Sequence, residues 1–381
     1  MRSTKLVSVV AVLGLCVLQA YSGPAFYSLG TNVTPSGISA DGGMVAARLS
    51  GSGFFTWTES DGLVSIGGNF GSGYGGSTAV SADGTVICGN ATNPNSDLSE
   101  MAYYDVVAGS WTPVGCLWSG GAPGSEASNS WGISGDGGTL VGSAWVDVTK
   151  VHATKWTAET GLVDLGSLHE DRSSRANAVS HDGSTIVGWQ DCPGGTRQAA
   201  IWSGGAETLL YYDGQPLGEG NVISGDGSVV AGYGGWSTMV DNIRCAWRWT
   251  EDGGAELLGT LTPGTPEYIT EQGATGVSAD GHTIVGYERP PVSWFGPVGG
   301  DGFLWRDGTM VNLTEYALEA GVPLPSGYTL ALPLSISADG MTIAGWGRAE
   351  GSFIPDGFII RLPEPASLTL LGLSVLVLRR R

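Results

Sequence analysis

Residues 177–189 read NAVSHDGSTIVGW, and this phrase contains the pattern that organises the whole chain. The pair Asp182-Gly183 is a strong hairpin signal, because glycine accepts the positive φ angle that tight primed turns require. Apolar and strand-forming residues flank the pair in the segments 177–180 and 185–189. We therefore predict a β-hairpin in which an Asp-Gly turn joins two short strands.

The same phrase occurs seven times along the chain. Its general form is an apolar residue, serine, any residue, aspartate and glycine, followed by a short apolar run that usually ends in glycine. The turn aspartates are Asp41, Asp83, Asp136, Asp182, Asp226, Asp280 and Asp339, and their spacings are 42, 53, 46, 44, 54 and 59 residues. A period in this range indicates a solenoid or a propeller. One carboxylate per turn supplies too few oxygens for a calcium shell, so we interpret these aspartates as turn formers and expect no metal ligands.

Each repeat contains two further predicted strands after the hairpin. The third strand usually ends in tryptophan, at Trp57, Trp156, Trp202, Trp249 and Trp305. A fourth short strand follows a glycine-rich turn, as in residues 162–165, 208–210 and 256–258. Four short strands per period are typical of a propeller blade, and the long 3.6-residue periodicity of a helical solenoid is absent. We expect the tryptophans to pack between blades.

The two ends of the repeat region complement each other. The last repeat has three predicted strands, near residues 334–337, 342–346 and 358–361, but no fourth strand follows. Residues 26–29 predict an extra strand before the first repeat. Pairing these two ends would remove two exposed sheet edges. The sequence therefore predicts an all-β, seven-bladed β-propeller over residues 23–362, closed by its N-terminal strand, with an open β-solenoid as the alternative.

Composition agrees with an all-β chain, and the N-terminus predicts export. The 381 residues include 64 glycines and 14 tryptophans, and only 14% are charged. Arg2 and Lys5 precede an apolar run over residues 6–18, and small residues follow, so residues 1–22 are predicted to be a signal peptide. Cys88, Cys116, Cys192 and Cys245 remain after export and could form disulfides in an oxidising exterior, with the pairing open.

The C-terminal residues 363–381 have a pattern of their own. Pro363, Glu364 and Pro365 precede the apolar run 366–378, and the chain finishes with Arg379, Arg380 and Arg381. A helix over this run would be about 20 Å long, which is too short for a permanent membrane span of about 30 Å. The terminal arginines predict that the tail is held on the cytoplasmic side.

The order of these three features resembles the PEP-CTERM sorting signal of exported proteins in Gram-negative bacteria. The resemblance implies a short apolar sorting helix, transient inner-membrane contact and processing by an exosortase-type sorting enzyme. It also implies a final location at the cell surface or in the extracellular matrix. Loss of residues 1–22 and 366–381 would remove five bases and no acids, so the formal charge would move from −19 to −24. So acidic a chain is not expected to bind nucleic acid.

The repeats carry a second resemblance. Residues 153–156 (ATKW), 161–166 (GLVDLG), 178–180 (AVS) and 186–188 (IVG) resemble the HAF-type extracellular repeat. That family often finishes in a PEP-CTERM tag, which implies the same location but no settled activity. This chain departs from the family phrase at Thr154 and Ala200, where phenylalanine is usual, and retains it at Phe303.

The predicted blades place the connections on two faces of a disc. The Asp-Gly turns and the turns between third and fourth strands share one face, here called the turn face. The connections between second and third strands and between blades share the other, here called the loop face. The loop face receives the long, irregular segments 90–101, 189–197, 287–302 and 314–333. Variable loops on a rigid scaffold usually carry binding sites, so Tyr287, Trp294 and Phe295 are the predicted ligand face.

We find no motif for catalysis, a metal or a cofactor in a suitable context, and so predict a protein that is not an enzyme and needs no cofactor. The expected role is a binding or structural module for extracellular polysaccharide or a surface protein. One alternative is a propeller hydrolase or lyase acting on polysaccharide, with Glu170 and Asp171 as the acids to nominate. Another is a spacer without a ligand. Three or more acids beside a cleft on the loop face would favour the enzyme, and a loop face without concavity would favour the spacer.

Overall fold

The computed structural model describes residues 23–69, 76–118, 126–169, 171–262, 264, 269–290 and 296–363. The predicted signal peptide, and the sorting tail beyond Pro363, lie outside the described residues. Within these ranges, no helix is both long and apolar enough to cross a membrane.

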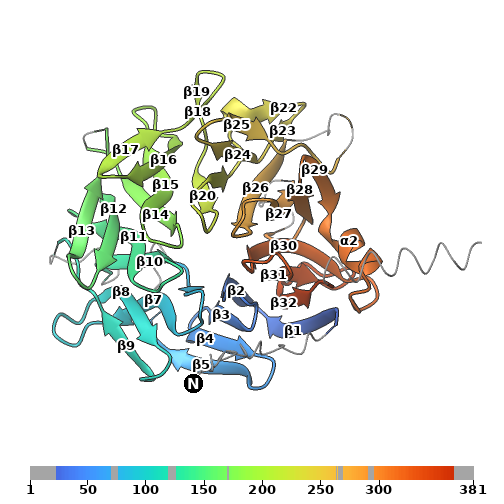
Figure 1. The fold of residues 1–381 in the computed structure, drawn as a ribbon, viewed down its shortest axis with the longest axis horizontal. Helices are drawn as coiled ribbons and strands as arrows, with labels where there is room; N and C mark the ends of the chain where they lie inside the picture. The colour runs from blue at the N-terminus through green and yellow to red at the C-terminus, as the bar shows by residue number, and fades with distance from the viewer. Residues whose placement is uncertain are drawn as a thin grey trace, which may run out of the picture.

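The described chain forms seven antiparallel blades arranged in a ring, which confirms the predicted seven-bladed propeller (Figure 1). Blade 1 consists of β2 (Val33–Ile38), β3 (Met44–Leu49), β4 (Gly53–Thr58) and β5 (Gly62–Gly67), and blade 2 of β6 (Ala79–Val80), β7 (Val86–Thr92), β8 (Ser99–Asp105) and β9 (Ser110–Pro113). Blade 3 consists of β10 (Ser128–Ile133), β11 (Thr139–Trp145), β12 (Val151–Thr157) and β13 (Gly161–Gly166), and blade 4 of β14 (Ser174–Val179), β15 (Thr185–Asp191), β16 (Arg197–Ser203) and β17 (Ala206–Leu209). Blade 5 consists of β20 (Gly220–Ile223), β21 (Val229–Gly232), β24 (Trp247–Thr250) and β25 (Gly254–Leu257), and blade 6 of β26 (Thr270–Val277), β27 (Thr283–Arg289), β28 (Asp301–Arg306) and β29 (Thr309–Asn312). Blade 7 includes β30 (Thr329–Ile336), β31 (Thr342–Arg348) and β32 (Asp356–Arg361).

The outer strand of blade 7 is the N-terminal strand β1 (Ala25–Thr31). It pairs with β32 in antiparallel register from Ala25–Arg361 to Thr31–Asp356, and the two strands lie side by side in Figure 1. At the far end of β32, the Leu362 N–H donates to the Met341 carbonyl, next to the Asp-Gly turn of blade 7. The described chain therefore finishes at the turn face.

Each Asp-Gly turn is fixed by its own serine and aspartate. In blade 4, Ser180 Oγ donates to Asp182 Oδ1 at 2.7 Å and accepts the Thr185 N–H at 3.0 Å. Asp182 Oδ1 also accepts the Ser184 N–H, and Gly183 has a φ of +72°. The same serine–aspartate hydrogen bond occurs in all seven turns. These bonds explain why serine and aspartate recur in the phrase.

Backbone hydrogen bonds link each turn to the next one around the ring. Between most neighbouring blades, the residue that separates serine from aspartate donates its N–H to the carbonyl of the equivalent residue in the next turn. Examples are the bonds from Ala40 to Ala82 and from His181 to Gly225, both at 2.9 Å. Between two pairs of neighbouring blades, the aspartate N–H donates to that carbonyl instead, at 3.3 Å. The series includes a bond of 3.2 Å from Ala338 of blade 7 to Ala40 of blade 1. The turn face thus carries a circuit of hydrogen bonds, here called the turn circuit.

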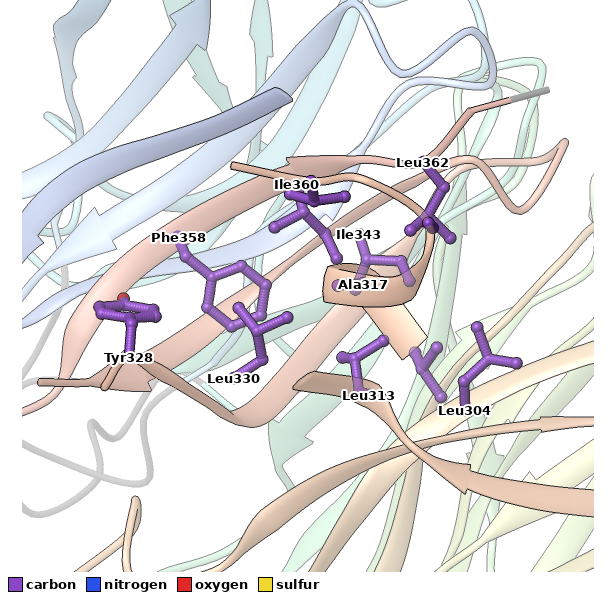
Figure 2. Packing of buried hydrophobic residues seen from close by; sticks show 12 residues of the cluster. Leu304, Leu313, Ala317, Tyr328, Leu330, Ile343, Phe358, Ile360 and Leu362 are labelled. Carbon is purple, nitrogen blue, oxygen red and sulfur yellow. The ribbon is translucent and has the colours of Figure 1, made fainter. Parts of the chain in front are cut away.

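The hydrophobic core lies between neighbouring blades rather than inside one unit. Trp57 packs at 4.9 Å from the Tyr27 ring, in a cluster that includes Ile359 of blade 7. Trp156 similarly lies 5.5 Å from Tyr103 of the preceding blade. The prediction that these tryptophans pack between blades is therefore confirmed. Figure 2 shows the cluster between blades 6 and 7, where Leu304 faces strands of the last blade.

One segment differs from its prediction as an irregular loop. Residues 314–333 contain most of the helix α2 (Leu313–Glu319) and the first half of β30. The Asn312 side chain caps the helix by accepting the N–H groups of Thr314 and Glu315. Leu313 and Ala317, one helical turn apart, are buried in the cluster of Figure 2. A helix of seven residues gives too few apolar positions for a helical period to be detected in the sequence.

Smaller additions decorate blades 4 to 6. A hairpin of β18 (Tyr211–Tyr212) and β19 (Gln215–Pro216) precedes β20, and a short 3-10 turn covers Trp236–Thr238. A second hairpin, β22 (Met239–Val240) and β23 (Ile243–Arg244), leaves blade 5 and pairs in parallel with β26 of blade 6. This insertion ties two blades together at the loop face.

Candidate functional site

A central channel follows the axis of the ring and is lined by the first strands of all seven blades. Its volume is about 340 Å³. Bulges in the first strands turn polar side chains toward it, as at Asn177 and Thr275. These groups are used within the structure, since Asn177 Nδ2 donates to the Gly220 carbonyl at 2.7 Å and Thr275 Oγ1 to that of Pro333 at 2.6 Å. The channel lining therefore joins blades together.

The glycine that completes the repeat phrase lies opposite these bulges. A Cβ atom on Gly142 or Gly188 would lie 1.9 Å from a carbonyl oxygen, that of Asn129 or Arg175 respectively. Only glycine permits such an approach of two backbones. The position of the bulge, and with it the direction of the channel-facing side chain, is thus encoded by this glycine.

Three adjoining pockets form a groove on the loop face, across blades 3 to 5. The outer pocket (about 410 Å³) and the middle pocket (about 220 Å³) share Thr149, Ser173 and Asp191. The middle pocket and the inner pocket (about 580 Å³) share Arg197, and Tyr233 joins the inner pocket to the channel. We call this row of pockets the blade 3–5 groove. Its lining comes from connections between second and third strands and between blades, and from the strand ends beside them.

Arginine and tryptophan side chains alternate along the inner wall of the groove. The Arg175 guanidinium carbon lies 3.6 Å from the Trp131 ring centre and 5.1 Å from that of Trp189. Arg197 lies 4.0 Å from the Trp189 ring centre. Trp189 is only 4% exposed, whereas the Arg197 side chain is 48% exposed. We call these four side chains the Arg–Trp ladder, and its open end is a guanidinium.

Glu219 holds both arginines of the ladder in place. Its two carboxylate oxygens accept from Arg175 Nη2 at 2.6 Å and from Arg197 Nη1 at 2.7 Å. Asn177 Oδ1 accepts from Arg175 Nε at 2.7 Å. Burial lowers the pKa of the Arg175 guanidinium from its ordinary value, and the charge of Glu219 acts in the opposite direction. The ladder is therefore positioned by side chains before any ligand arrives.

The outer pocket contains acids and bases together. Lys150 Nζ lies 2.9 Å from Asp171 and 3.4 Å from Asp147. Burial raises the pKa of Asp191, and the charges of Arg197 and Arg172 partly oppose this. The pockets are lined by four bases and four acids, Lys150, Arg172, Arg175, Arg197, Asp147, Asp171, Asp191 and Glu219. The groove is therefore close to neutral within a strongly acidic chain.

The structure places the sequence-predicted residues in separate regions. Tyr287 lies within β27 and is 8% exposed, not at the tip of a loop; its ring packs 6.3 Å from Tyr233 and 4.3 Å from the Arg289 guanidinium. Trp294 and Phe295 of the predicted ligand face lie outside the described residues. Of the predicted sorting motif, Pro363 is described and buried, and the remainder, Glu364, Pro365, Arg379, Arg380 and Arg381, lies outside the described residues.

The remaining predicted residues are located in the described blades. The seven turn aspartates all lie in Asp-Gly turns, and no group of three or more histidine, cysteine, aspartate or glutamate residues among the described positions is arranged to hold a metal. Cys88, Cys116, Cys192 and Cys245 are free thiols, so the structure contains none of the disulfides that the sequence left open for them.

Sequence reasoning missed the Arg–Trp ladder and Glu219. A signal was present, because Arg172, Arg175 and Arg197 cluster in a chain with only 17 lysines and arginines. Arg175 lies at the start of the first strand of blade 4, and Arg197 begins the third strand of the same blade. Both positions are at the loop face, where the propeller topology brings them together. Nothing in the sequence placed Glu219, from the next blade, between them.

Comparisons with known proteins identify the fold but no family. No family model matches the chain, and no curated protein sequence matches it. The oligogalacturonate lyase from Vibrio parahaemolyticus is 12% identical with a TM-score of 0.54, over 90% of this chain and 98% of that one. The β-propeller domain of the Trilobed protease from Pyrococcus furiosus is 11% identical with a TM-score of 0.53, over 88% and 94%.

TolB from Acinetobacter baumannii is 13% identical with a TM-score of 0.45; the match covers 74% of this chain and 62% of TolB, less than two thirds of its length. At such identities the likeness to the lyase and the protease domain shows a shared propeller architecture alone. The chemistry of the site must therefore be argued from this chain's own residues.

Proposed function

We propose that the chain is an exported cell-surface or matrix propeller that binds extracellular polysaccharide through the blade 3–5 groove. The observation that carries the proposal is the row of three adjoining pockets, which offers consecutive subsites to an extended polymer. The predicted signal peptide and PEP-CTERM tail support export and sorting by an exosortase-type enzyme. Pairing of β1 with β32, together with the turn circuit, supports a ring closed by the N-terminal strand.

The shape and lining of the groove favour a binding module over a spacer. A spacer needs no concave surface, whereas this loop face holds three pockets in one row. Hydroxyl, carboxylate and guanidinium groups line them, which suits the many hydroxyl groups of a sugar chain. The rigid propeller also keeps these groups in place without ordering a loop on binding.

A matched pair of substitutions tests the groove. Thr149 is exposed and lines both the outer and the middle pocket, so Thr149→Trp should obstruct the groove. Thr160 is an exposed threonine of the same blade on the turn face, so Thr160→Trp is the control. We expect the full chain and the Thr160 variant to co-sediment with the host's extracellular polysaccharide, and the Thr149 variant to remain in solution.

Two other results would change the assignment. Equal binding by both variants would exclude the groove, and loss of binding in a Trp294→Ala/Phe295→Ala variant would place the site on the ligand face predicted from sequence. Binding by none of the proteins, including the unchanged chain, would contradict the polysaccharide proposal and favour the spacer.

A second candidate function is an enzyme that cleaves polysaccharide. Three acids, Asp147, Asp171 and Asp191, line the outer pocket, which is the arrangement expected of such a site. Lys150 forms ion pairs with the first two, but Asp191 has a pKa raised by burial, as a general acid requires. Shortening of the polymer by the unchanged chain, abolished in Asp191→Asn, would establish this function. An unchanged polymer length after prolonged incubation would leave the binding module.

A further inference from the structure

We infer that the inner half of the groove recognises an anionic group, the carboxylate of a uronic-acid unit, at Arg197. This inference rests on the proposed function and specifies the class of polysaccharide. The inner and middle pockets meet at Arg197, so one side chain contacts both subsites.

The order of side chains in the Arg–Trp ladder excludes a simple aromatic sugar platform. Trp189 has Arg175 and Arg197 packed against its ring and is 4% exposed, so its faces are not available for stacking on a pyranose ring. The group that the ladder presents to the groove is instead the half-exposed guanidinium of Arg197. A guanidinium binds a carboxylate through parallel N–H groups, with charge-assisted hydrogen bonds.

Unused donors surround this position. Arg197 carries five N–H donors, and its hydrogen bond within the described residues goes from Nη1 to Glu219. Trp189 is one of the residues that line the middle pocket, and its buried indole Nε1 has no hydrogen-bond partner among the described residues. A buried donor of this kind favours a ligand that only accepts, and an ionised carboxylate is such a group.

The charge around the ladder limits how dense the ligand's charge can be. Arg175 and Arg197 together exceed the single charge of Glu219 that lies between them, and Asp191 adds a second acid to the middle pocket. The rest of the chain is strongly acidic and would repel a closely spaced polyanion, although acids beyond about 8 Å are screened at physiological salt. The site therefore suits one carboxylate per sugar unit better than the dense phosphates of a nucleic acid.

The test compares two oligosaccharides of the same backbone. The probes are an alginate-derived hexasaccharide, a uronate oligomer, and the same oligosaccharide with its carboxyl groups reduced to alcohols. Binding to the full chain is measured by calorimetry at low and moderate salt. We expect the uronate to bind about ten-fold more tightly than the reduced form, and its affinity to fall as salt rises.

Two arginine variants provide the site and its control. Arg197→Gln should lose about ten-fold of the uronate affinity and little of the affinity for the reduced form. Arg248 also packs on a tryptophan, 4.7 Å from the Trp305 ring centre, and donates to Glu256 at 2.7 Å, but it lies outside the groove. Arg248→Gln should therefore bind both oligosaccharides as the unchanged chain does.

The outcomes separate this inference from the proposed function. Equal affinity for both probes, or a uronate preference that Arg197→Gln leaves intact, would overturn the inference while groove binding stands. Failure of both probes, together with failure of the host polysaccharide, would overturn both. The comparison of probes on the unchanged chain needs no variant, so it holds even if Arg197→Gln misfolds.

Discussion

The turn face and the loop face are built from the same seven repeats but follow opposite rules. On the turn face, every repeat makes the same serine–aspartate bond, and the turns are joined in one circuit. On the loop face, blades 3 to 5 depart from the others and together form the groove. Repetition here maintains the ring, whereas departures from the repeat form the candidate site. Three predictions test this division.

The largest expected effect concerns the glycine that faces the first-strand bulge. Gly142→Ala would place a methyl group 1.9 Å from the Asn129 carbonyl oxygen, so a strand must shift. We expect a loss of about 3 kcal/mol in the free energy of unfolding, measured by denaturant titration. Gly194→Ala is the control, because no atom lies within 4 Å of its added Cβ. Equal stability of the two variants would show that the bulge is not fixed by this glycine.

A smaller loss is expected from one turn of the circuit. Ser180→Ala removes the buried acceptor of the Thr185 N–H and the donor to Asp182. It should cost about 1–2 kcal/mol, while the ring remains folded on the other turns. Ser184→Ala, which removes only an exposed hydroxyl bonded to Asp182, should cost less than about 0.5 kcal/mol. A complete loss of folding in Ser180→Ala would mean that each turn is indispensable to the circuit.

The smallest expected effect is a difference in pH dependence between the faces. Hydrogen bonds from Ser180 and Ser184 lower the pKa of Asp182 to about 2, so its contribution to stability is present above its ordinary pKa of 3.8 and is lost as pH falls toward 2. Burial raises the pKa of Asp191, so its effect has the opposite sign, and stability falls as pH rises through the raised pKa.

Thermal unfolding between pH 2 and pH 7 would measure both contributions. Asp182→Asn should reduce the fall in stability as pH decreases toward 2. Asp191→Asn should reduce the fall in stability as pH rises above the ordinary aspartate pKa of 3.8. Profiles that change in the same direction for both variants would contradict the contrast between the two faces.

Much of the architecture could be predicted because its determinants are local. The phrase over residues 177–189 contains the turn, both strands and the bulge-facing Gly188 within a few positions. The pairing partner of β1 was also predictable, because a missing strand at one end matched an extra strand at the other. Helix α2 was missed because its stability depends on burial against blade 7 rather than on its own seven residues.

The candidate site was harder to predict because its determinants are distant in sequence. Arg175 is held by Trp131 of one blade and Glu219 of another, and no spacing rule joins these three positions. The sequence indicated the face on which the groove lies, since residues 189–197 were among its irregular segments. It favoured Trp294 and Phe295 within that face because adjacent aromatic residues are easier to recognise in a sequence than a stacked arginine. The electrostatic balance of the groove required the positions of all its charges.

The hydrogen bond from Leu362 to Met341 fixes where the described chain leaves the propeller. A tether attached beyond residue 363 would pull on β32 along its own direction, at the turn face. Strand β32 is flanked by β1 and β31, so hydrogen bonds on both of its sides would resist the load together instead of opening one after another. In the same geometry, the groove would point away from the anchoring surface and toward the surrounding medium.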